Sequence, residues 1–343
     1  MPLGEGRLLR VGWLNGVAVI AGNGLLRFDP QSQSADSTAT SFISHAHGDH
    51  LRRISQLGKS YLTPETMDIG NTFHVLAGPN MRPLRLGESI KQDDVEVIAH
   101  NAGHMLGSAQ FEIRTPDSTV VYTGDINCRD MFTTKAADNI PCDILVLETT
   151  YGVPFYVFPD LTQTSVEIVE WALSQIKVGK IPVFKAYSGG KAQEVVRIFN
   201  TLTKLPVITE GAATGITDAY TRNGVKLQHV DAEAPSADQL LKSGECVCVT
   251  STSHGLLSHA KAAQAVATGW ALGNRFRGVD AAFPLSGHAD FQQLVEYVKR
   301  ARPRELLTVH GFKAEFSSYI RRRLGVKASP IPLIRQKQLG EYL

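Results

Sequence analysis

Apolar residues in this chain gather in short runs, and the runs end in polar or glycine-rich sequence. Residues 40–44, 95–100, 119–123 and 306–309 are runs of this kind. Short runs rich in β-branched and aliphatic residues are typical of buried strands. Because neighbouring strands deliver the residues at their ends to a common edge, we expect the polar residues that follow these runs to lie close together.

The middle of the chain has a different pattern. Residues 160–278 alternate helical patterns with short strands, such as 181–184 and 247–250, whereas the part before them is rich in strands. Alternation of this kind is typical of a parallel α/β lobe. We therefore predict one domain formed by residues 1–159 and 279–343, a smaller domain of residues 160–278 inserted into it, and a cleft between the two.

Residues 290–298 predict a helix that begins just after His288. Asp290 can cap the first turn, Gln293 stands three residues further on, and the apolar residues share one face. A phosphate oxygen at the start of this helix would meet both the imidazole of His288 and the positive end of the helix dipole. His288 is therefore a candidate phosphate-binding residue.

The composition is that of an ordinary globular protein, with 343 residues, 43% of them hydrophobic, and a formal net charge of +2. This charge is too small to indicate a nucleic-acid-binding protein by itself. The apolar stretch at residues 11–20 is interrupted by Asn15 and two glycines, so we interpret it as a strand pair and not as a signal peptide. We expect no membrane association, because no apolar segment approaches the length of a membrane span.

The four cysteines are Cys128, Cys142, Cys246 and Cys248, and they form neither a disulfide framework nor a CxxC metal pair. Proteins of oxidising compartments commonly use cysteines for disulfides. We therefore expect a cytoplasmic, intracellular protein.

The residues best suited to metal chemistry are concentrated at positions 45–50, with the sequence His-Ala-His-Gly-Asp-His. Imidazole nitrogens and carboxylate oxygens are ligands that zinc accepts readily. Alternate side chains of an extended segment point the same way, so His45 and His47 can share one ion while Asp49 and His50 turn toward a second. The alternative is a polar surface loop that happens to be rich in histidine.

Further candidate ligands follow the predicted strands. His104 comes after the run at 95–100, Asp125 after 119–123 and His310 after 306–309. A single histidine at a strand end is more often structural than metal-binding, but the His-x-His-x-Asp-His segment makes a shared metal site the better interpretation.

In their order along the chain, these residues resemble the successive motifs of the metallo-β-lactamase superfamily. The match includes Asp29 in Arg-Phe-Asp-Pro, the segment at 45–50, His104 and Asp125. The resemblance covers almost the whole chain, and it implies an α/β fold built as a four-layer αββα sandwich.

Three further motifs resemble those of the β-CASP nucleases, which cut DNA or RNA and carry an inserted β-CASP α/β domain. They are Leu-Glu-Thr-Thr-Tyr-Gly around Glu148, Ser-Gly-His-Ala-Asp around His288 and Val-His-Gly around His310. Together these motifs are highly specific, although Asp29 or Glu148 alone would mean little.

We expect two zinc ions per chain, the second replaceable by Mn²⁺ or Mg²⁺. We assign the first ion to His45, His47 and His104, the bridge to Asp125, and the second ion to Asp49, His50 and His310. In the resulting two-metal hydroxide mechanism, the ions lower the pKa of a bridging water and neutralise the phosphodiester during in-line attack.

Four residues form the predicted catalytic group beside the metals. Asp49 would orient the attacking water, and Asp29 would hold a ligand histidine by its other ring nitrogen. His288 would supply a proton to the leaving oxygen, with Glu148 hydrogen-bonded to it so that the imidazole keeps its orientation.

A second phosphate candidate lies at residues 186–196, where a strand ends, glycines turn the backbone and a helix begins. Ser188, Gly189 and Lys191 are the predicted phosphate-binding residues. The segment lacks P-loop spacing, so it does not indicate nucleotide hydrolysis. The segment at 186–196 is similar to an SLGK-type segment of Artemis-like DNA nucleases, with Gly189 where that pattern usually has leucine. The alternative is a loop with a purely structural role.

The substrate prediction depends on smaller signals. Residues 150–159 resemble a stretch of the DNA-processing branch, whereas His310 is typical of RNA-processing members and of bacterial ligase-associated exonucleases. We therefore expect DNA as the first choice and RNA as the second, with closest resemblance to the Artemis-like and prokaryotic ligase-associated group. The predicted activity is DNA repair or end processing by 5′-to-3′ exonuclease and structure-specific endonuclease action.

Two alternative functions remain at this point: a β-CASP ribonuclease of RNA maturation or decay, and a small-molecule metallohydrolase. The predicted second lobe over the zinc site disfavours the small-molecule enzyme. We expect a monomer, with other DNA-repair factors as further partners.

Overall fold

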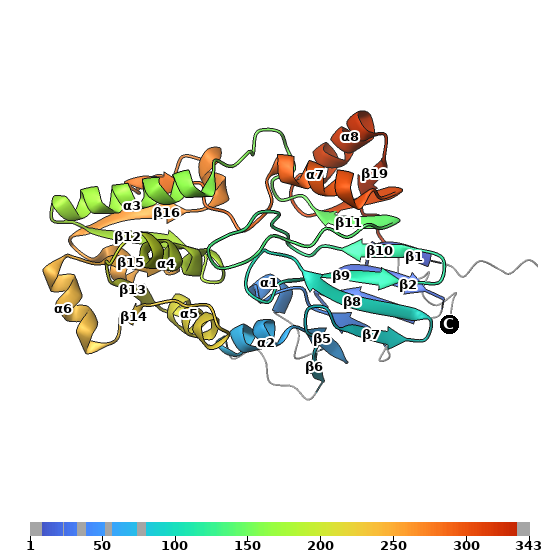
Figure 1. The fold of residues 1–343 in the computed structure, drawn as a ribbon, viewed down its shortest axis with the longest axis horizontal. Coiled ribbons are helices and arrows are strands. Elements are labelled where there is room, and N and C mark those ends of the chain that lie inside the picture. Colours follow the sequence, from blue (N-terminus) through green and yellow to red (C-terminus); the bar gives the residue numbers. More distant parts are fainter. Residues whose placement is uncertain (1–8, 23, 33–38, 52–56, 74–79, 335–343) are drawn as a thin grey trace, which may run out of the picture.

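The computed structural model describes residues 9–22, 24–32, 39–51, 57–73 and 80–334. In these parts of the chain, three β-sheets and their helices form two lobes that lie side by side (Figure 1). None of the helices described is both long and apolar enough to cross a membrane.

The first lobe contains two sheets that face each other. The first sheet has the strand order β1-β2-β3-β4-β5-β6. Its strands are β1 (Leu9–Trp13), β2 (Val17–Ala21), β3 (Gly24–Phe28), β4 (Thr40–Phe42), β5 (Ser60–Leu62) and β6 (Met81–Pro83). Pairing is antiparallel from β1 to β3 and parallel from β3 to β6.

The predicted strand pair at residues 11–20 corresponds to β1 and β2, which pair in antiparallel register from Leu9 opposite Ala21 to Trp13 opposite Val17. The turn between them contains Asn15 (φ 48°) and Gly16 (φ 124°). Both angles are positive, and asparagine and glycine are the residues that adopt such angles most readily.

The second sheet has the strand order β19-β18-β11-β10-β9-β8-β7. Its strands are β7 (Ser89–Gln92), β8 (Val95–Asn101), β9 (Ala109–Arg114), β10 (Thr119–Tyr122), β11 (Ile144–Glu148), β18 (Glu305–Val309) and β19 (Lys327–Pro330). Strands β8, β10, β11 and β18 all run in the same direction, so their carboxyl ends meet at one edge. The runs at 95–100, 119–123 and 306–309 are strands, as predicted.

Aromatic side chains fill the space between the two sheets. Phe28 lies 5.2 Å from Phe42, 5.5 Å from Phe111 and 5.7 Å from Tyr122, measured between ring centroids. All four are fully buried, and burial of this size supplies much of the free energy that holds two sheets together.

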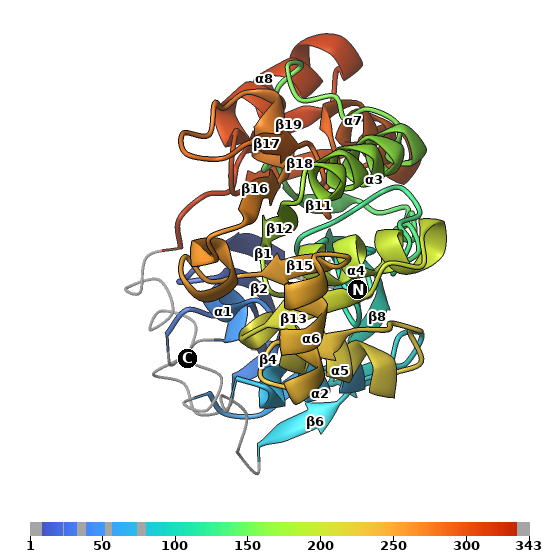
Figure 2. The same cartoon turned by 90° about the vertical axis from the view of Figure 1, so that its left-hand side faces the viewer.

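Helices cover the outer faces of this pair of sheets. Helices α7 (Phe291–Ala301) and α8 (Lys313–Leu324) pack on the second sheet, and the short α1 (Gly48–Leu51) and α2 (Pro64–Asn71) pack beside the first. In the view turned by 90°, α7 and α8 lie at one end of the molecule and α2 at the other (Figure 2). This is the predicted four-layer αββα arrangement.

The predicted helix after His288 is α7. The Asp290 side chain accepts a hydrogen bond from the Gln293 amide at 2.9 Å, and the Gln293 side chain accepts one from the Asp290 amide at 3.3 Å. This reciprocal capping pattern fixes where the helix begins.

The second lobe is a parallel sheet with helices on both faces, in the strand order β14-β13-β15-β12-β16-β17. Its elements are α3 (Leu161–Lys177), β12 (Ile181–Ala186), α4 (Lys191–Leu202), β13 (Val207–Glu210), α5 (Ala212–Arg222), β14 (Val230–Asp231), α6 (Pro235–Ser243), β15 (Val247–Thr250), the 3₁₀ helices η2 (Gly255–Ser258) and η3 (Gly269–Leu272), β16 (Ala262–Ala267) and β17 (Ala281–Phe283). The lobe is continuous in sequence, and its last strand β17 lies beyond the predicted boundary at residue 278.

Polar contacts join the two lobes. The Glu194 carboxylate on α4 accepts hydrogen bonds from the Phe132 amide and from the amide and hydroxyl of Thr133 in the first lobe. On another side, Asp68 of α2 forms an ion pair with Arg222 of α5 at 2.9 Å. The Glu194 contacts tie α4, whose first turn faces the cleft, to the first lobe, and the ion pair ties α5 to it.

Candidate metal centre

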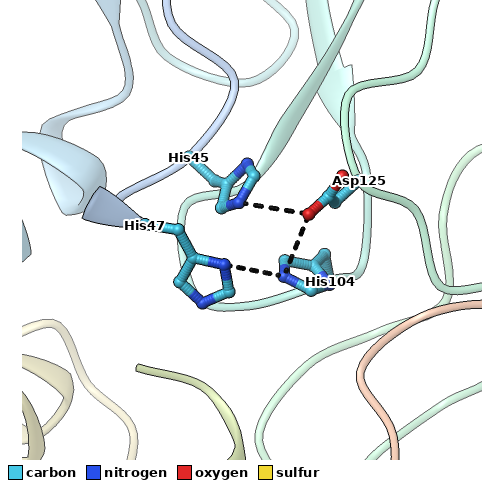
Figure 3. Close-up of side chains that lie close together, drawn as sticks. All are labelled: His45, His47, His104 and Asp125. Atoms are coloured by element: carbon cyan, nitrogen blue, oxygen red, sulfur yellow. Dashed lines mark hydrogen bonds and ion pairs between the residues drawn. The ribbon is translucent and has the colours of Figure 1, made fainter. Parts of the chain in front are cut away.

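Four side chains converge at the edge where the two lobes meet: His45, His47, His104 and Asp125 (Figure 3). Each offers one ligand atom, and these four atoms all lie within 4.8 Å of one another. Asp125 Oδ2 lies 3.5 Å from His45 Nε2 and 3.8 Å from His104 Nε2, and His104 Nε2 lies 3.4 Å from His47 Nδ1. The sequence motifs that supply them are separated by up to eighty residues, and the common strand edge brings them together.

In each of the three histidines of the cluster, one ring nitrogen contacts an oxygen atom outside the cluster. His45 Nδ1 lies 2.8 Å from Ser44 Oγ, His104 Nδ1 lies 2.8 Å from the Gly287 carbonyl, and His47 Nε2 lies 3.2 Å from the Gly189 carbonyl. The other nitrogen of each ring is the one in the central cluster. Outer hydrogen bonds of this kind fix the tautomer and the orientation of metal-binding histidines.

The chemistry of this donor set fits zinc. Burial, as the largest cause, lowers the pKa of His45, His47 and His104 well below its usual value, so the rings are neutral and can donate a lone pair. His45 Nε2 is buried without any hydrogen-bond partner. A buried polar atom without a partner is costly, and a cation at this point would satisfy it. Imidazole nitrogens and a carboxylate oxygen are donors that zinc accepts readily.

The residues predicted for a second ion lie beside this cluster in a looser arrangement. His50 Nε2 is 3.6 Å from Asp49 Oδ2, and the His50 and His310 ring centroids are 6.4 Å apart. Asp49 is the exposed member, with 71% of its side chain accessible. Asp49, His50 and His310 line the same cleft as Asp125.

Asp29 lies behind this second group. Its Oδ2 is 2.9 Å from His50 Nδ1, and it also accepts hydrogen bonds from the Tyr122 hydroxyl at 2.8 Å and the Ser44 hydroxyl at 2.7 Å. Asp29 adopts a positive φ of 47°, which its hydrogen bonds help to maintain. Its contacts are with a histidine, two hydroxyls and the Ser44 amide, and it is not among the residues that line the cleft.

A second carboxylate and histidine pair borders the cluster. His288 Nδ1 lies 2.9 Å from Glu148 Oε1, and Glu148 Oε2 accepts a hydrogen bond from the Thr150 amide at 2.8 Å. Burial alone would lower the pKa of His288, but the Glu148 and Asp125 carboxylates raise it overall. The His288 ring lies 4.4 Å from that of His104 and lines the cleft, whereas Glu148 is fully buried behind it.

The segment at 186–196 faces the cluster from the second lobe. Ser188 and Lys191 line the cleft, but Gly189 does not, because its carbonyl oxygen is directed at His47. A Cβ at Gly189 would lie 3.2 Å from Met105 Cε and 3.5 Å from His47 Cδ2, so the backbone approaches the site closely. Burial lowers the pKa of Lys191, whose ammonium group shares the cleft with Asp125.

The cleft between the lobes has a volume of about 700 Å³. One wall bears the metal-site residues, and the other bears residues at the carboxyl ends of the parallel strands: Lys185, Ala186, Tyr187, Ser188, Ser251, Val266, Ala267 and Thr268. In parallel α/β sheets this edge is the usual place for a ligand.

Comparison with known proteins gives relatives of this chain. Residues 281–329 match a family model described as "Zn-dependent metallo-hydrolase RNA specificity domain". An "RNase J-like protein" of Methanocaldococcus jannaschii is 24% identical, over 81% of this chain and 82% of that protein. The chain has the metallo-β-lactamase/β-CASP fold.

Two further relatives differ in their printed names. A "Probable DNA ligase" of Opitutus terrae is 31% identical over 88% of this chain, which spans only 29% of that protein. "Ribonuclease TTHA0252" of Thermus thermophilus is 27% identical over 61% of this chain and 53% of that protein. These names support a metal-dependent nuclease of the metallo-β-lactamase/β-CASP type, but they do not single out the Artemis-like DNA group.

A solved structure shows the same architecture. A crystal structure of a protein of unknown function from Enterococcus faecalis superimposes with a TM-score of 0.67, covering 94% of this chain and 97% of that one. The sequence identity is 16%, so the likeness concerns the fold alone.

Several groups of the β-CASP site were not identified from the sequence. Ser44 contacts both Asp29 and His45, and its place directly before the His-x-His-x-Asp-His segment was the signal that could have found it. The carbonyl oxygens of Gly189 and Gly287 have no signal in the sequence, since every residue has a carbonyl group. Only the folded β-CASP domain brings the Gly189 carbonyl to His47.

Proposed function

We propose that this protein is a metal-dependent nuclease that hydrolyses phosphodiester bonds. The observation that supports this most is the convergence, on one cleft between two domains, of the His45, His47, His104 and Asp125 cluster with the His288 and Glu148 pair. A metal cluster alone would serve many hydrolases. A second imidazole, held by a buried carboxylate and facing the same cleft, adds a group that can act on the leaving oxygen.

Zinc bound by these four residues would supply a Lewis acid that neutralises phosphodiester charge and makes a coordinated water more acidic. We propose that Asp49, His50 and His310 hold a second ion together with Asp125. The looser spacing and the exposure of Asp49 are consistent with a site that also accepts Mn²⁺ or Mg²⁺.

His288 is proposed as the residue that acts on the leaving oxygen. Glu148 engages Nδ1, which leaves Nε2 available to donate a hydrogen bond or a proton. Because Glu148 reaches the reaction only through His288, Glu148 is a positioning residue, and Asp29 has the same role toward His50.

Lys191 and Ser188 are proposed to bind substrate phosphate from the β-CASP side. Both line the cleft opposite the metal cluster, and Lys191 opens helix α4, where the helix dipole also favours an anion. His288 lies at the start of α7 and is proposed to contact the same phosphate. Gly189 is left out of this group because its carbonyl oxygen faces His47.

The names of the relatives favour RNA as the substrate. The relatives from Methanocaldococcus jannaschii and Thermus thermophilus are both named as ribonucleases, so RNA replaces DNA as our first choice. DNA is the second candidate, because the match that covers 88% of this chain is to a protein named as a probable DNA ligase. Exonucleolytic 5′-to-3′ action and action as a monomer remain proposals on either substrate.

The test is incubation of the purified zinc-loaded protein with end-labelled RNA, single-stranded DNA, duplex DNA and hairpin DNA of one sequence. We expect cleavage of RNA, with products ordered from the 5′ end. Cleavage confined to DNA would reverse the order of the two candidates. Failure to cleave any of the four, while the protein hydrolyses small esters or lactams, would overturn the nuclease proposal.

A further inference from the structure

Two aromatic residues that follow neighbouring strands of the β-CASP sheet, Tyr187 and Trp270, line the cleft. Strands β12 and β16 pair in parallel, with Ala186 opposite Ala267 at their carboxyl ends (Figure 1). Tyr187 follows directly after the first strand, and Trp270 follows three residues after the second. Both residues line the cleft that contains the metal-site side chains.

The Tyr187 ring contacts two neighbouring side chains, and the residue is half exposed. Its ring centroid lies 4.6 Å from that of His47 at an interplanar angle of 65°, and Lys191 Nζ lies 5.5 Å from the Tyr187 centroid. Even so, 49% of this residue is exposed. An aromatic ring therefore lies beside the metal cluster, in a residue that is half exposed and lines the cleft.

Trp270 is supported in the same way by a group of aromatic residues. Its ring centroid lies 4.8 Å from that of Tyr151 and 5.4 Å from that of Tyr156. Tyr151 in turn lies 5.9 Å from His288. The indole is therefore fixed relative to the proposed leaving-group residue, and its remaining surface faces the cleft.

We propose that Tyr187 and Trp270 stack on nucleobases next to the scissile phosphate, and that the cleft therefore selects single-stranded nucleic acid. This inference rests on the proposed nuclease function. The metal-site residues and the proposed phosphate-binding residues line the same cleft as Tyr187 and Trp270, so a nucleotide whose phosphate lies at the metals would place its bases near these two rings. The aromatic rings are the groups that match the flat apolar face of a base.

The single-strand preference follows from the geometry of nucleic acids. In a duplex each base face is covered by its neighbours, and only the edges are accessible in the grooves. The faces become available only when the strand is single and unstacked. Because every base has such a face, this contact would select strandedness without selecting sequence.

The test measures binding in a His288→Ala background, so that the substrate stays intact. Single-stranded and duplex RNA of one sequence are titrated by fluorescence anisotropy, and a 2-aminopurine in the single strand reports stacking. We expect Tyr187→Ala and Trp270→Ala each to weaken single-strand binding by about 5- to 150-fold and to reduce the 2-aminopurine quenching. Tyr187→Phe and Trp270→Phe should restore both signals, because phenylalanine keeps a stacking face.

Phe155→Ala is the matched control, since Phe155 is an aromatic residue that is 63% exposed and lies outside the cleft lining. Because Trp270→Ala also removes an aromatic ring that packs on Tyr151, the exposed Tyr187 supplies an independent variant. Unchanged binding and quenching after Tyr187→Ala would overturn the stacking proposal. Equal affinity of the His288→Ala protein for duplex and single-stranded RNA would overturn it as well. If the protein with native His288 cleaves nucleic acid in that case, the nuclease proposal stands and only the stacking inference fails.

Discussion

Nδ1 of His288 lies 2.9 Å from Oε1 of Glu148, a carboxylate at the end of β11 that solvent does not reach. The pair joins two segments that are 140 residues apart, and it places the imidazole beside the metal cluster without making it a member of the tight four-residue set. Asp125 also forms a second group with Glu148 and His288, whose ligand atoms lie within 4.8 Å of one another. We predict that His288 acts on the leaving oxygen and is not a zinc ligand, and the zinc content of a His288 variant distinguishes the two roles.

Substitution His288→Ala should therefore reduce nuclease activity by about 10²- to 10⁴-fold, the usual contribution of a general acid. Zinc content should stay close to that of the unmodified protein, measured by plasma mass spectrometry alongside turnover. His259→Ala is a suitable control, because His259 lies before the amino end of β16, away from the cleft. Loss of zinc together with activity would show that His288 is a ligand.

Asp125→Ala should abolish both tight zinc binding and cleavage. Asp125 supplies the one carboxylate of the four-residue cluster and lies within 3.8 Å of two of its imidazoles, so its removal leaves the cluster with neutral ligands alone. Chelator competition gives the zinc affinity, and end-labelled substrate gives the activity. Asp117→Ala, in the exposed turn at the opposite end of β10, should leave both unchanged. Near-normal turnover of the Asp125 variant would contradict the metal mechanism.

Glu194 should make stability depend on pH. Burial raises the pKa of its carboxyl group, although the amide and hydroxyl of Thr133 partly offset this effect. Between the usual carboxyl pKa and the raised value, the folded protein binds a proton that the unfolded chain releases. The free energy of unfolding must therefore fall as pH rises through this window.

The measurement is urea unfolding of the parent and of Glu194→Gln between about pH 4 and pH 7. Glutamine does not titrate, so the stability of the parent minus that of the variant should decrease as pH rises. Glu170→Gln, an exposed site on α3, serves as the control. A difference that stays constant, or that increases with pH, would contradict the assignment.

Gly311→Ala should destabilise the fold more than Gly325→Ala. Both glycines have a positive φ, 50° and 68° respectively, so alanine is strained at each by about 1–2 kcal/mol. At Gly311 a Cβ would also overlap the Thr149 carbonyl oxygen, whereas at Gly325 nothing lies within 4 Å. Thermal unfolding of the two variants isolates the cost of the overlap, and equal losses would contradict it.

Much of the candidate site could be predicted because its polar residues follow the ends of apolar strands. His104, Asp125 and Glu148 lie at or just after the carboxyl ends of β8, β10 and β11, and those strands run in the same direction. Apolar runs reveal strands because burial requires them, and polar residues at their ends stand out against that pattern. The helix after His288 was predicted for the same kind of reason, since Asp290 and Gln293 cap it through local contacts.

The substrate and the end of the inserted domain were harder to predict, because no local sequence pattern indicates them. The preference for DNA rested on motif details and is not supported by most of the relatives' names, because the same metal chemistry serves both polymers. The predicted end of the inserted domain missed β17, since Ala281–Phe283 is too short to show a strand pattern without its partner β16.

The amino-acid sequence by itself predicted the candidate ligand types and an inserted lobe, and it determined the helix that follows His288, because residue chemistry, hydrophobic patterning and capping act over short distances. The tertiary structure alone decided which nitrogen of each histidine faces the centre. It did so through Ser44 and through the carbonyl oxygens of Gly189 and Gly287, the latter two brought to the site by distant parts of the chain. It likewise decided that Tyr187 and Trp270 share one cleft, since their separation along the chain is closed only when β12 and β16 pair.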